Sequence, residues 1–124
     1  MNPAYQDAVF EVEDTLPSHF FIITAYNPRG LNAPMSRNLH QDATLKSVLT
    51  QRGLSPIRVT GRDPKNTHRE PGWGVQVEAE DALHFAKLFK QDAFYEVSDG
   101  DLKLIDCKTR EVVHLGDWFQ RLVD

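Results

Sequence analysis

One apolar run constrains the fold of this chain more than any other feature. Residues 20–26 are Phe-Phe-Ile-Ile-Thr-Ala-Tyr, so nearly every position is apolar, β-branched or aromatic. A strand with this pattern is typical of the centre of a sheet, where both faces are buried. The run stops at the turn Asn27-Pro28-Arg29-Gly30, because Pro28 has no N–H to donate to a neighbouring strand. We therefore expect a central strand that carries Asn27 and Arg29 at its carboxyl end, where α/β sheets usually bind ligands.

Strand and helix patterns alternate along the rest of the chain. The expected order is β, β, α, β, β, α, β, β, β and a terminal helical turn. The strands are expected at residues 8–13, 20–26, 57–60, 75–78 and 93–97, in the partner strand after Gly100 and at 111–115, with helices at 36–52 and 81–90 and a short helix from Trp118. This order predicts an α+β fold, in which two main helices and a short C-terminal helix pack on a mixed, mostly antiparallel sheet.

A tight turn at Asp99-Gly100 gives the most specific local prediction. The Asp-Gly pair favours the two-residue turn whose positive φ angles match the twist of a β-hairpin. Apolar residues then pair on one face and opposite charges pair on the other, which supports a single register. The expected pairs are Val97 with Leu102, Tyr95 with Leu104, and Glu96 with Lys103.

Length and composition indicate a single globular domain over residues 1–124. A chain with 40% hydrophobic and 26% charged residues buries a core without disulfides. Cys107 is the single cysteine, so no disulfide forms within the chain and a reducing compartment is expected. The sequence contains no signal-peptide pattern and no apolar run that could span a membrane. We therefore expect a cytoplasmic protein with no membrane contact.

Basic residues gather in the middle of an acidic chain. The formal net charge is −4, yet residues 29–69 carry +6, while residues 1–28 carry −4 and residues 70–124 carry −6. Clustered Lys and Arg side chains supply the field and the hydrogen bonds that bind an anionic ligand or a phosphate backbone. The alternative is that these side chains pair with the acidic flanks once the chain has folded.

The helix expected at 36–52 has a polar first turn on its buried face. Helical spacing back from Leu45 leads to Asn38, which places this amide on the face that packs against the sheet. Asn38 then projects toward the strand end that carries Asn27. The alternative is that Asn38 is the N-cap of the helix, with Gln41 completing a capping box.

Several turn motifs together resemble a known family. They are Thr24-Ala25-Tyr26-Asn27-Pro28-Arg29-Gly30, Asn38 with Leu45 and Leu49, Gly61-Arg62-Asp63-Pro64, Glu70-Pro71-Gly72-Trp73, and Phe89-x-Gln91-x-Ala93-x-Tyr95. The combination resembles the bacterial domain-of-unknown-function family 3293 over residues 5–106. This resemblance implies a small, stand-alone bacterial protein of the cytoplasm, and it implies no activity.

The motifs share one placement, because each joins a rigid turn to a polar side chain at the end of a strand or helix. The asparagines supply donors and acceptors, the arginines supply planar forks that suit carboxylate or phosphate, and the tryptophan supplies a stacking face. The candidate ligand-binding residues are Asn27, Arg29, Asn38, Arg62, Glu70, Trp73 and Gln91. The alternative roles are architectural: turn chemistry for Asn27, an ion pair between Arg62 and Glu70, a core position for Trp73 and a helix cap for Gln91.

The sequence carries no specific catalytic or metal-binding signature. His40 with Asp42 and His68 with Glu70 place ring nitrogens near carboxylates, but neither pair has the helix-borne spacing of a zinc motif. No serine lies in a nucleophile elbow, no glycine loop could cradle a phosphate, and Cys107 is expected to be a bystander. We therefore expect no metal and no cofactor, and the catalytic residues, if any exist, stay unknown.

Three functions remain open. The first is a non-enzymatic binding or regulatory module that holds an anionic ligand, either a nucleotide-like small molecule or a nucleic acid, against Arg29, Arg62 and Asn38. The alternative is a small hydrolase or transferase in which Glu70 is the general base and Arg62 holds an anionic group. The third is an interaction protein whose acidic C-terminal half binds a basic protein partner.

The first two functions require a specific geometry. Asn27, Arg29, Asn38, Arg62, Glu70 and Gln91 are expected to line a single concavity. The strands that end near Asn27 and Arg62 must then run in the same direction, so that their carboxyl ends lie at one edge of the sheet.

Overall fold

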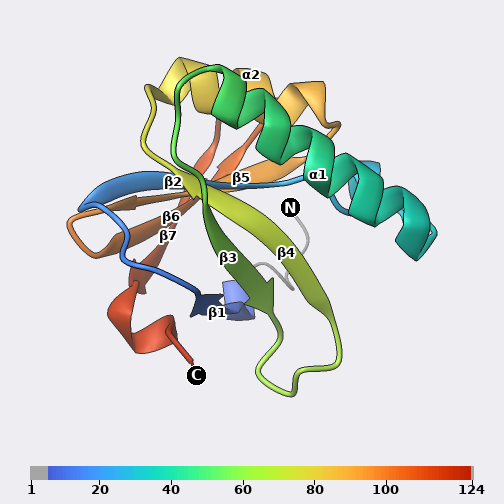
Figure 1. Cartoon of the computed structure of the whole chain (residues 1–124). Coiled ribbons are helices and arrows are strands. Elements are labelled where there is room, and N and C mark those ends of the chain that lie inside the picture. The colour runs from blue at the N-terminus through green and yellow to red at the C-terminus, as the bar shows by residue number, and fades with distance from the viewer. Residues whose placement is uncertain (1–5, 124) are drawn as a thin grey trace.

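A computed structural model describes residues 6–123 of the chain (Figure 1). It consists of a curled antiparallel sheet, two helices and short 3₁₀ turns, which confirms the α+β fold class. In chain order the elements are β1 (Val9–Val12), β2 (His19–Thr24), η2 (Pro28–Gly30), α1 (Met35–Gln51), β3 (Ile57–Arg62), β4 (Arg69–Val75), α2 (Ala79–Leu88), β5 (Ala93–Ser98), β6 (Asp101–Asp106), β7 (Val112–Asp117) and η3 (Phe119–Arg121).

The sheet places β2 at its centre, as the apolar run predicts. The strand order is β1-β3-β4-β2-β5-β6-β7, and every pairing between these strands is antiparallel. Because β2 and β3 are both antiparallel to β4, which lies between them, β2 and β3 run in the same direction. The prediction that their carboxyl ends lie at one edge of the sheet is therefore confirmed.

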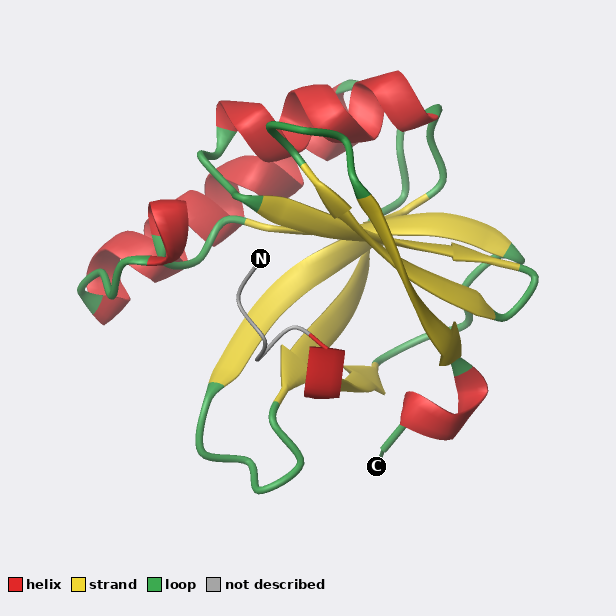
Figure 2. Cartoon of the chain, turned by 180° about the vertical axis from the view of Figure 1, so that it is seen from behind, coloured by secondary structure: helices red, strands yellow, loops and turns green. Residues whose placement is uncertain are grey.

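Two apolar cores lie on opposite faces of the sheet. Both helices cover one face (Figures 1 and 2), where Phe21 and Ile23 of β2 pack against Leu45 of α1 and Phe85 of α2. On the other face, the curl of the sheet encloses a second core that contains Phe10 and other apolar side chains of the strands. This alternation of neighbouring β2 residues between two cores explains why nearly all of the run is apolar.

The curl brings the first strand of the sheet to the segment that follows the last strand. Phe10 in β1 forms a parallel bridge with Leu122, and the backbone N–H of Val123 donates to the Phe10 carbonyl at 2.9 Å. The Arg121 guanidinium also donates to the carbonyl of Ala8 at 3.0 Å. The sheet is therefore an incomplete barrel, and this contact, which we call the seam, joins its two edges.

The fourth strand differs from its prediction. It spans Arg69–Val75 rather than residues 75–78, and it forms a hairpin with β3, which continues to Arg62 rather than ending at residue 60. Pro71 is tolerated because β2 ends opposite Gly72, so that β4 is paired only with β3 at Pro71. A proline is acceptable where a strand has one free side, and the sequence alone does not indicate where that side begins.

Local predictions for the helices and hairpins are largely confirmed. In the β5–β6 hairpin, Asp99 and Gly100 have φ angles of +49° and +83°, and all three predicted cross-strand pairs are present. Helix α1 buries Asn38 and Asp42 beside its two core leucines, as the stripe predicts. The N-cap of α1 is Pro34, however, so the interpretation of Asn38 as a cap is wrong. The C-terminal helix is a single 3₁₀ turn, Phe119–Arg121.

Candidate functional site

One mouth of the incomplete barrel contains a small cavity with a partly polar lining. Its volume is about 230 Å³, and it lies where β2 and β3 end and where β4 and β5 begin. Four predicted site residues line it, namely Asn27, Arg62, Glu70 and Gln91. The apolar part of the lining comes from Phe10, Ile22, Ala93, Phe94, Tyr95 and Leu104 among others. We call this space the mouth cavity.

Glu70 is one of two acidic residues that line the mouth cavity, the other being Asp63. The Glu70 side chain is 24% exposed, and its Oε2 atom lies 3.4 Å from the Nε2 atom of His68. Burial raises the pKa of the Glu70 carboxyl, while the nearby His68 acts in the opposite direction. The β3–β4 loop holds His68 in place, because the Asp63 carboxylate accepts hydrogen bonds from the backbone N–H groups of Thr67 and His68, both at 2.7 Å.

Arg62 is engaged elsewhere, so the predicted ion pair with Glu70 is wrong. The Nε atom of Arg62 donates to Glu11 in β1 at 2.8 Å, and its Nη1 atom donates to the carbonyl of Asp63 at 2.9 Å. Arg69 binds the same carboxylate: its Nη1 and Nη2 atoms donate to Oε2 and Oε1 of Glu11 at 2.7 and 2.8 Å. Glu11 therefore ties β1 to the β3–β4 hairpin, and it leaves Arg62 without a free fork for a ligand.

Asn27 and Asn38 contact each other directly behind the mouth cavity. The Nδ2 group of Asn38 donates to Oδ1 of Asn27 at 3.0 Å, and the backbone N–H of Asn27 donates to Oδ1 of Asn38, also at 3.0 Å. The projection of Asn38 toward Asn27 is thus confirmed. Asn38 is 3% exposed and does not line the mouth cavity, so its role is to hold the turn that carries Asn27.

Trp73 lies on the other face of the sheet, away from the mouth cavity. Its side chain belongs to the core under the helices, and its indole N–H donates to the Asp42 carbonyl at 3.2 Å. The Arg58 guanidinium lies over the ring at 3.7 Å and donates two hydrogen bonds of 2.7 Å to Asp42. The tryptophan face is therefore occupied within the fold, as the core alternative for Trp73 predicts.

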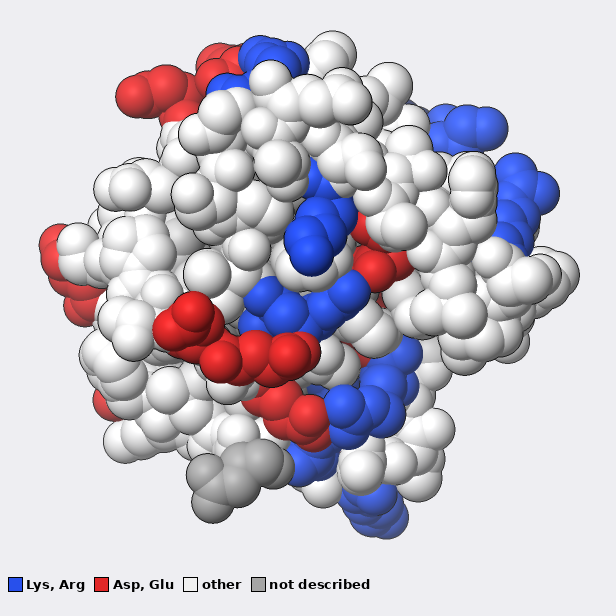
Figure 3. All heavy atoms as spheres, in the orientation of Figure 1, with Lys and Arg blue, Asp and Glu red and all other residues white. Residues whose placement is uncertain are grey.

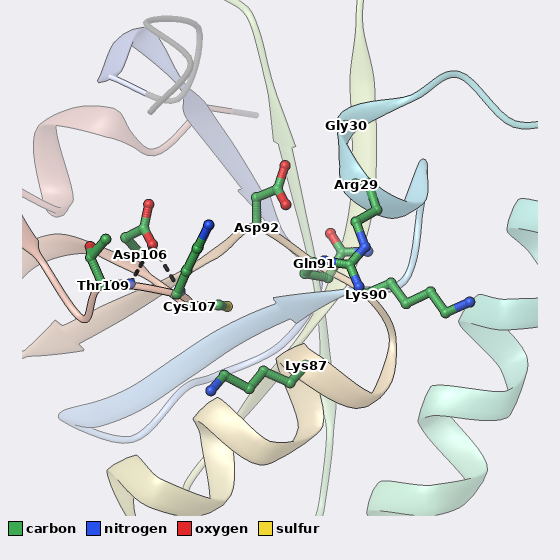
Figure 4. A pocket seen from close by; sticks show the side chains of 10 residues that line it. Arg29, Gly30, Lys87, Lys90, Gln91, Asp92, Asp106, Cys107 and Thr109 are labelled. Atoms are coloured by element: carbon green, nitrogen blue, oxygen red, sulfur yellow. Dashed lines mark hydrogen bonds between the residues drawn. The ribbon is translucent and has the colours of Figure 1, made fainter.

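A second, basic cavity adjoins the first at Gly30 and Gln91, which line both. Its volume is about 690 Å³. The side chains shown in Figure 4 come from the η2 turn, the end of α2 with the residues after it, and the β6–β7 turn. Four cations line this space, which we call the basic cavity, together with the carboxylates of Asp92 and Asp106; the cations are Arg29, Lys87, Lys90 and Lys108.

These four cations have no partner within residues 6–123, since none of their side chains forms a hydrogen bond or an ion pair there. Many other cations in the fold are paired. Arg58, Arg62, Arg69 and Arg110 all bind carboxylates. Figure 3 likewise shows basic and acidic side chains side by side on the face seen in Figure 1. Three of the eight cations in the basic middle block, Arg58, Arg62 and Arg69, thus pair with carboxylates, and Arg29 is the member of this block that lines the basic cavity.

Two of the unpaired cations have an uncommon backbone conformation. Arg29 and Lys90 both have φ of +59°, in the left-handed region that favours glycine. Lys90 directly follows Phe89, the C-cap of α2: its N–H donates to the carbonyl of Lys87, and the N–H of Gln91 donates to that of Ala86. This is the Schellman arrangement, where glycine is usual. The Arg29 N–H donates to the Lys90 carbonyl at 2.8 Å, which joins the two strained residues.

Gln91 forms the wall between the two cavities. Its Oε1 atom accepts a hydrogen bond from the Thr24 hydroxyl at 2.8 Å, and its Nε2 group donates to the carbonyls of Tyr26 and Phe89. The side chain therefore links the end of β2 to the end of α2. Gln91 thus binds the carbonyl of Phe89 at the end of α2, as the architectural alternative predicts, and it also lines both cavities.

Cys107 lines the basic cavity, but its thiol is a poor nucleophile. Its side chain is buried, and burial raises the pKa of the thiol to about 11. The thiolate needed for nucleophilic attack is scarce at neutral pH under these conditions. Among residues 6–123, no group of three or more His, Cys, Asp or Glu side chains could hold a metal ion.

The opposite mouth of the incomplete barrel has the opposite charge. A hollow there is lined by apolar residues such as Leu16, Phe20 and Phe119, together with Glu13, Asp14 and Asp99. No Lys or Arg is among its described lining residues. The two mouths therefore differ in charge, because the four cations of the basic cavity lie beside the mouth where β2 and β3 end.

The segment that supplies most of the lining of these two cavities also matches a known family. The family described as "protein of unknown function (DUF3293)" matches residues 23–94, from β2 to β5 and more than half of the chain. The chain belongs to this family. No curated protein and no solved structure matches the chain. DUF3293 membership thus covers Asn27, Arg29, Glu70 and Gln91, but not Lys108. In the described part of this DUF3293 protein, no helix is long and apolar enough to cross a membrane.

Sequence reasoning missed most of the basic cavity. In the sequence, Lys87 and Lys90 lie in the last turn of the helix expected at 81–90, where cations interact favourably with the helix dipole, so both have a sufficient structural reason. One signal was present in the sequence. Lys90 occupies the position after the C-cap of α2, where glycine is common, and Gln91 follows it directly. Nothing in the sequence links this helix end to Lys108, which the β6–β7 turn brings to the same cavity.

Proposed function

We propose that this DUF3293 protein is a cytoplasmic, non-enzymatic binding module for a small anionic molecule, which it holds in the basic cavity. One observation carries the proposal: Arg29, Lys87, Lys90 and Lys108 surround a single cavity without partners, and two of them have a strained backbone. Backbone strain persists where the rest of the structure enforces it, and it concentrates at ligand sites.

Charge and shape favour a small ligand over a nucleic-acid strand. The cavity has two carboxylates, Asp92 and Asp106, among its four cations, so its net charge is modest. A surface that follows a nucleic acid needs a longer stripe of positive charge. A compact phosphate or carboxylate can instead contact several of the cations at once.

The enzymatic alternative has weaker support. Glu70 lines a cavity and has a raised pKa, as a general base requires. The partner in that hypothesis is Arg62, whose donors bind Glu11 and a backbone carbonyl. A hydrolase or transferase would therefore need the cations of the adjoining cavity to hold the anionic group of its substrate.

Replacing Lys90 with glycine separates binding from stability. Lys90→Gly relieves the strained φ angle, so the free energy of unfolding is expected to rise by about 0.5–1 kcal/mol. The same change removes one cation, so the affinity for inorganic phosphate at low salt is expected to fall about fivefold. Urea unfolding measures the first effect, and NMR titration of the backbone amides with phosphate measures the second.

Arg110→Gly is the matched control. Arg110 also has a positive φ, at 64°, but its guanidinium pairs with Glu80 and does not line the basic cavity. This variant is expected to keep its phosphate affinity. Unchanged affinity in Lys90→Gly, or no saturable amide shift in the unmodified protein, would show that the basic cavity does not bind anions. Tighter binding of a short single-stranded DNA than of phosphate would contradict a small-molecule module.

A further inference from the structure

The mouth cavity and the basic cavity form two adjoining compartments of different character. They share Gly30 and Gln91 as lining residues. Gly30 adds no side chain to this boundary, and a Cβ atom built on it would lie 3.6 Å from the Asp92 carboxylate. A ligand held by the cations of one compartment can therefore extend into the other.

The mouth cavity suits a flat, uncharged ring. Apolar side chains from four strands line it, among them Phe10, Ile22 and Leu104. Its volume of about 230 Å³ equals the liquid volume of roughly eight waters, which is the size of a ring system rather than of a single ion. Apolar walls with a few placed polar groups are typical of ligand pockets, including those in the mouths of β-barrels.

Glu70 is a half-buried acceptor in the lining of this cavity. An ionised carboxylate only accepts hydrogen bonds, and its two oxygens can accept from two adjacent N–H groups. Its sole hydrogen-bonding neighbour among the described residues is His68, at the long distance of 3.4 Å. A ring whose edge carries adjacent N–H donors can therefore satisfy this carboxylate where water is partly excluded.

We propose that the ligand joins an anionic group to a flat ring with adjacent N–H donors on one edge, as in a guanine nucleotide. The anionic group lies among Arg29, Lys87 and Lys90, and the donor edge of the ring faces Glu70. This inference rests on the proposed function, because it assumes that the basic cavity binds the anion. It adds the second compartment and the chemistry of the uncharged part of the ligand.

Calorimetric titration with two probes tests the inference. Guanosine 5′-monophosphate is expected to bind the unmodified protein at least about tenfold more tightly than inorganic phosphate does. Glu70→Gln keeps the size of the side chain but replaces one acceptor oxygen with a donor group. This variant is expected to lose about tenfold in nucleotide affinity and to keep its phosphate affinity. Glu78→Gln, an exposed change outside both cavities, is the matched control.

A second variant makes the result independent of Glu70. Ala93→Leu places a larger side chain in the mouth cavity, so it is expected to weaken nucleotide binding and to leave phosphate binding unchanged. If the nucleotide binds no more tightly than phosphate, or if Glu70→Gln weakens both probes equally, the ring does not use the mouth cavity and this inference is wrong. The proposed function survives that result. In this titration, the proposed function is contradicted if neither probe binds.

Discussion

Asn38 illustrates how one buried side chain positions a turn of the site. Its amide satisfies both the side chain and the backbone N–H of Asn27, with two hydrogen bonds of 3.0 Å. Asn27 has φ of +48°, so it too lies in the left-handed region, directly before the turn that carries Arg29. The polar first turn of α1 therefore holds the strained turn in place, while Leu45 and Leu49 further along the same stripe pack into the core.

Removing the Asn38 amide tests this role. Asn38→Ala leaves the backbone N–H of Asn27 without its partner in a half-buried position. The free energy of unfolding is expected to fall by about 1–3 kcal/mol, as measured by urea denaturation. Asn32→Ala is the control, because Asn32 is exposed and its change is expected to stay within about 0.5 kcal/mol. Equal stability of both variants would mean that the amide pair does not hold the turn.

At the scale of elements, Glu11 acts as a clamp between β1 and the β3–β4 hairpin. The guanidinium groups of Arg69 and Arg62 hold the pKa of the Glu11 carboxyl at about 2, below its ordinary value of 4.5. Between these two pH values the unfolded chain takes up a proton that the folded chain does not. Stability from this group is therefore complete above pH 4.5, and it is lost as the pH falls toward 2.

Glu11→Gln is expected to flatten the pH dependence of stability. The variant is less stable than the unmodified protein at pH 7, and the difference shrinks as the pH is lowered through the window from 4.5 to 2. Urea unfolding at a series of pH values measures both curves. Glu70, whose raised pKa has the opposite sign, is present in both proteins and cancels from the comparison. Parallel curves would show that the clamp contributes nothing to folding.

Elements with strong local patterns could be predicted from the sequence, and contacts between distant segments could not. The β5–β6 hairpin was predictable because Asp99-Gly100 determines its turn, and β2 because its run needs burial on both faces. The predicted partner of Arg62, Glu70, was wrong. The true partner, Glu11, lies 51 residues away, and no local pattern points to it. The basic cavity was missed for the same reason, because its cations come from three separate segments: the η2 turn, the end of α2 and the β6–β7 turn.

The whole molecule depends on the seam between β1 and the segment after β7. Arg121 lies at its centre, where its guanidinium donates to the carbonyls of Gln6, Ala8 and Leu115 at 2.7, 3.0 and 3.0 Å. A charged donor that bonds three carbonyls holds together strands that share no ladder of hydrogen bonds. Closure of the barrel therefore relies on one side chain as well as on the Phe10–Leu122 bridge.

Arg121→Ala is expected to open the seam. The loss of three hydrogen bonds from a charged group is expected to lower the free energy of unfolding by about 2–3 kcal/mol. Hydrogen exchange of the β1 amides is expected to accelerate more than exchange in β5, which pairs with neither β1 nor β7. Arg37→Ala, on the exposed face of α1, is the control for loss of the charge. Equal acceleration in β1 and β5 would indicate a general loss of stability rather than local opening.

The seam can form only after nearly the whole chain has been synthesised, because it joins residues near both ends of the described segment. Arg121 and Ala8 are separated by 113 positions in the sequence. At the rate of translation, roughly 6–23 s pass between the synthesis of these two residues. During that time β1 has no neighbour on its seam side, and the core that contains Phe10 stays open to water. Newly made chains are therefore most exposed to aggregation and to chaperone capture just before the seam closes.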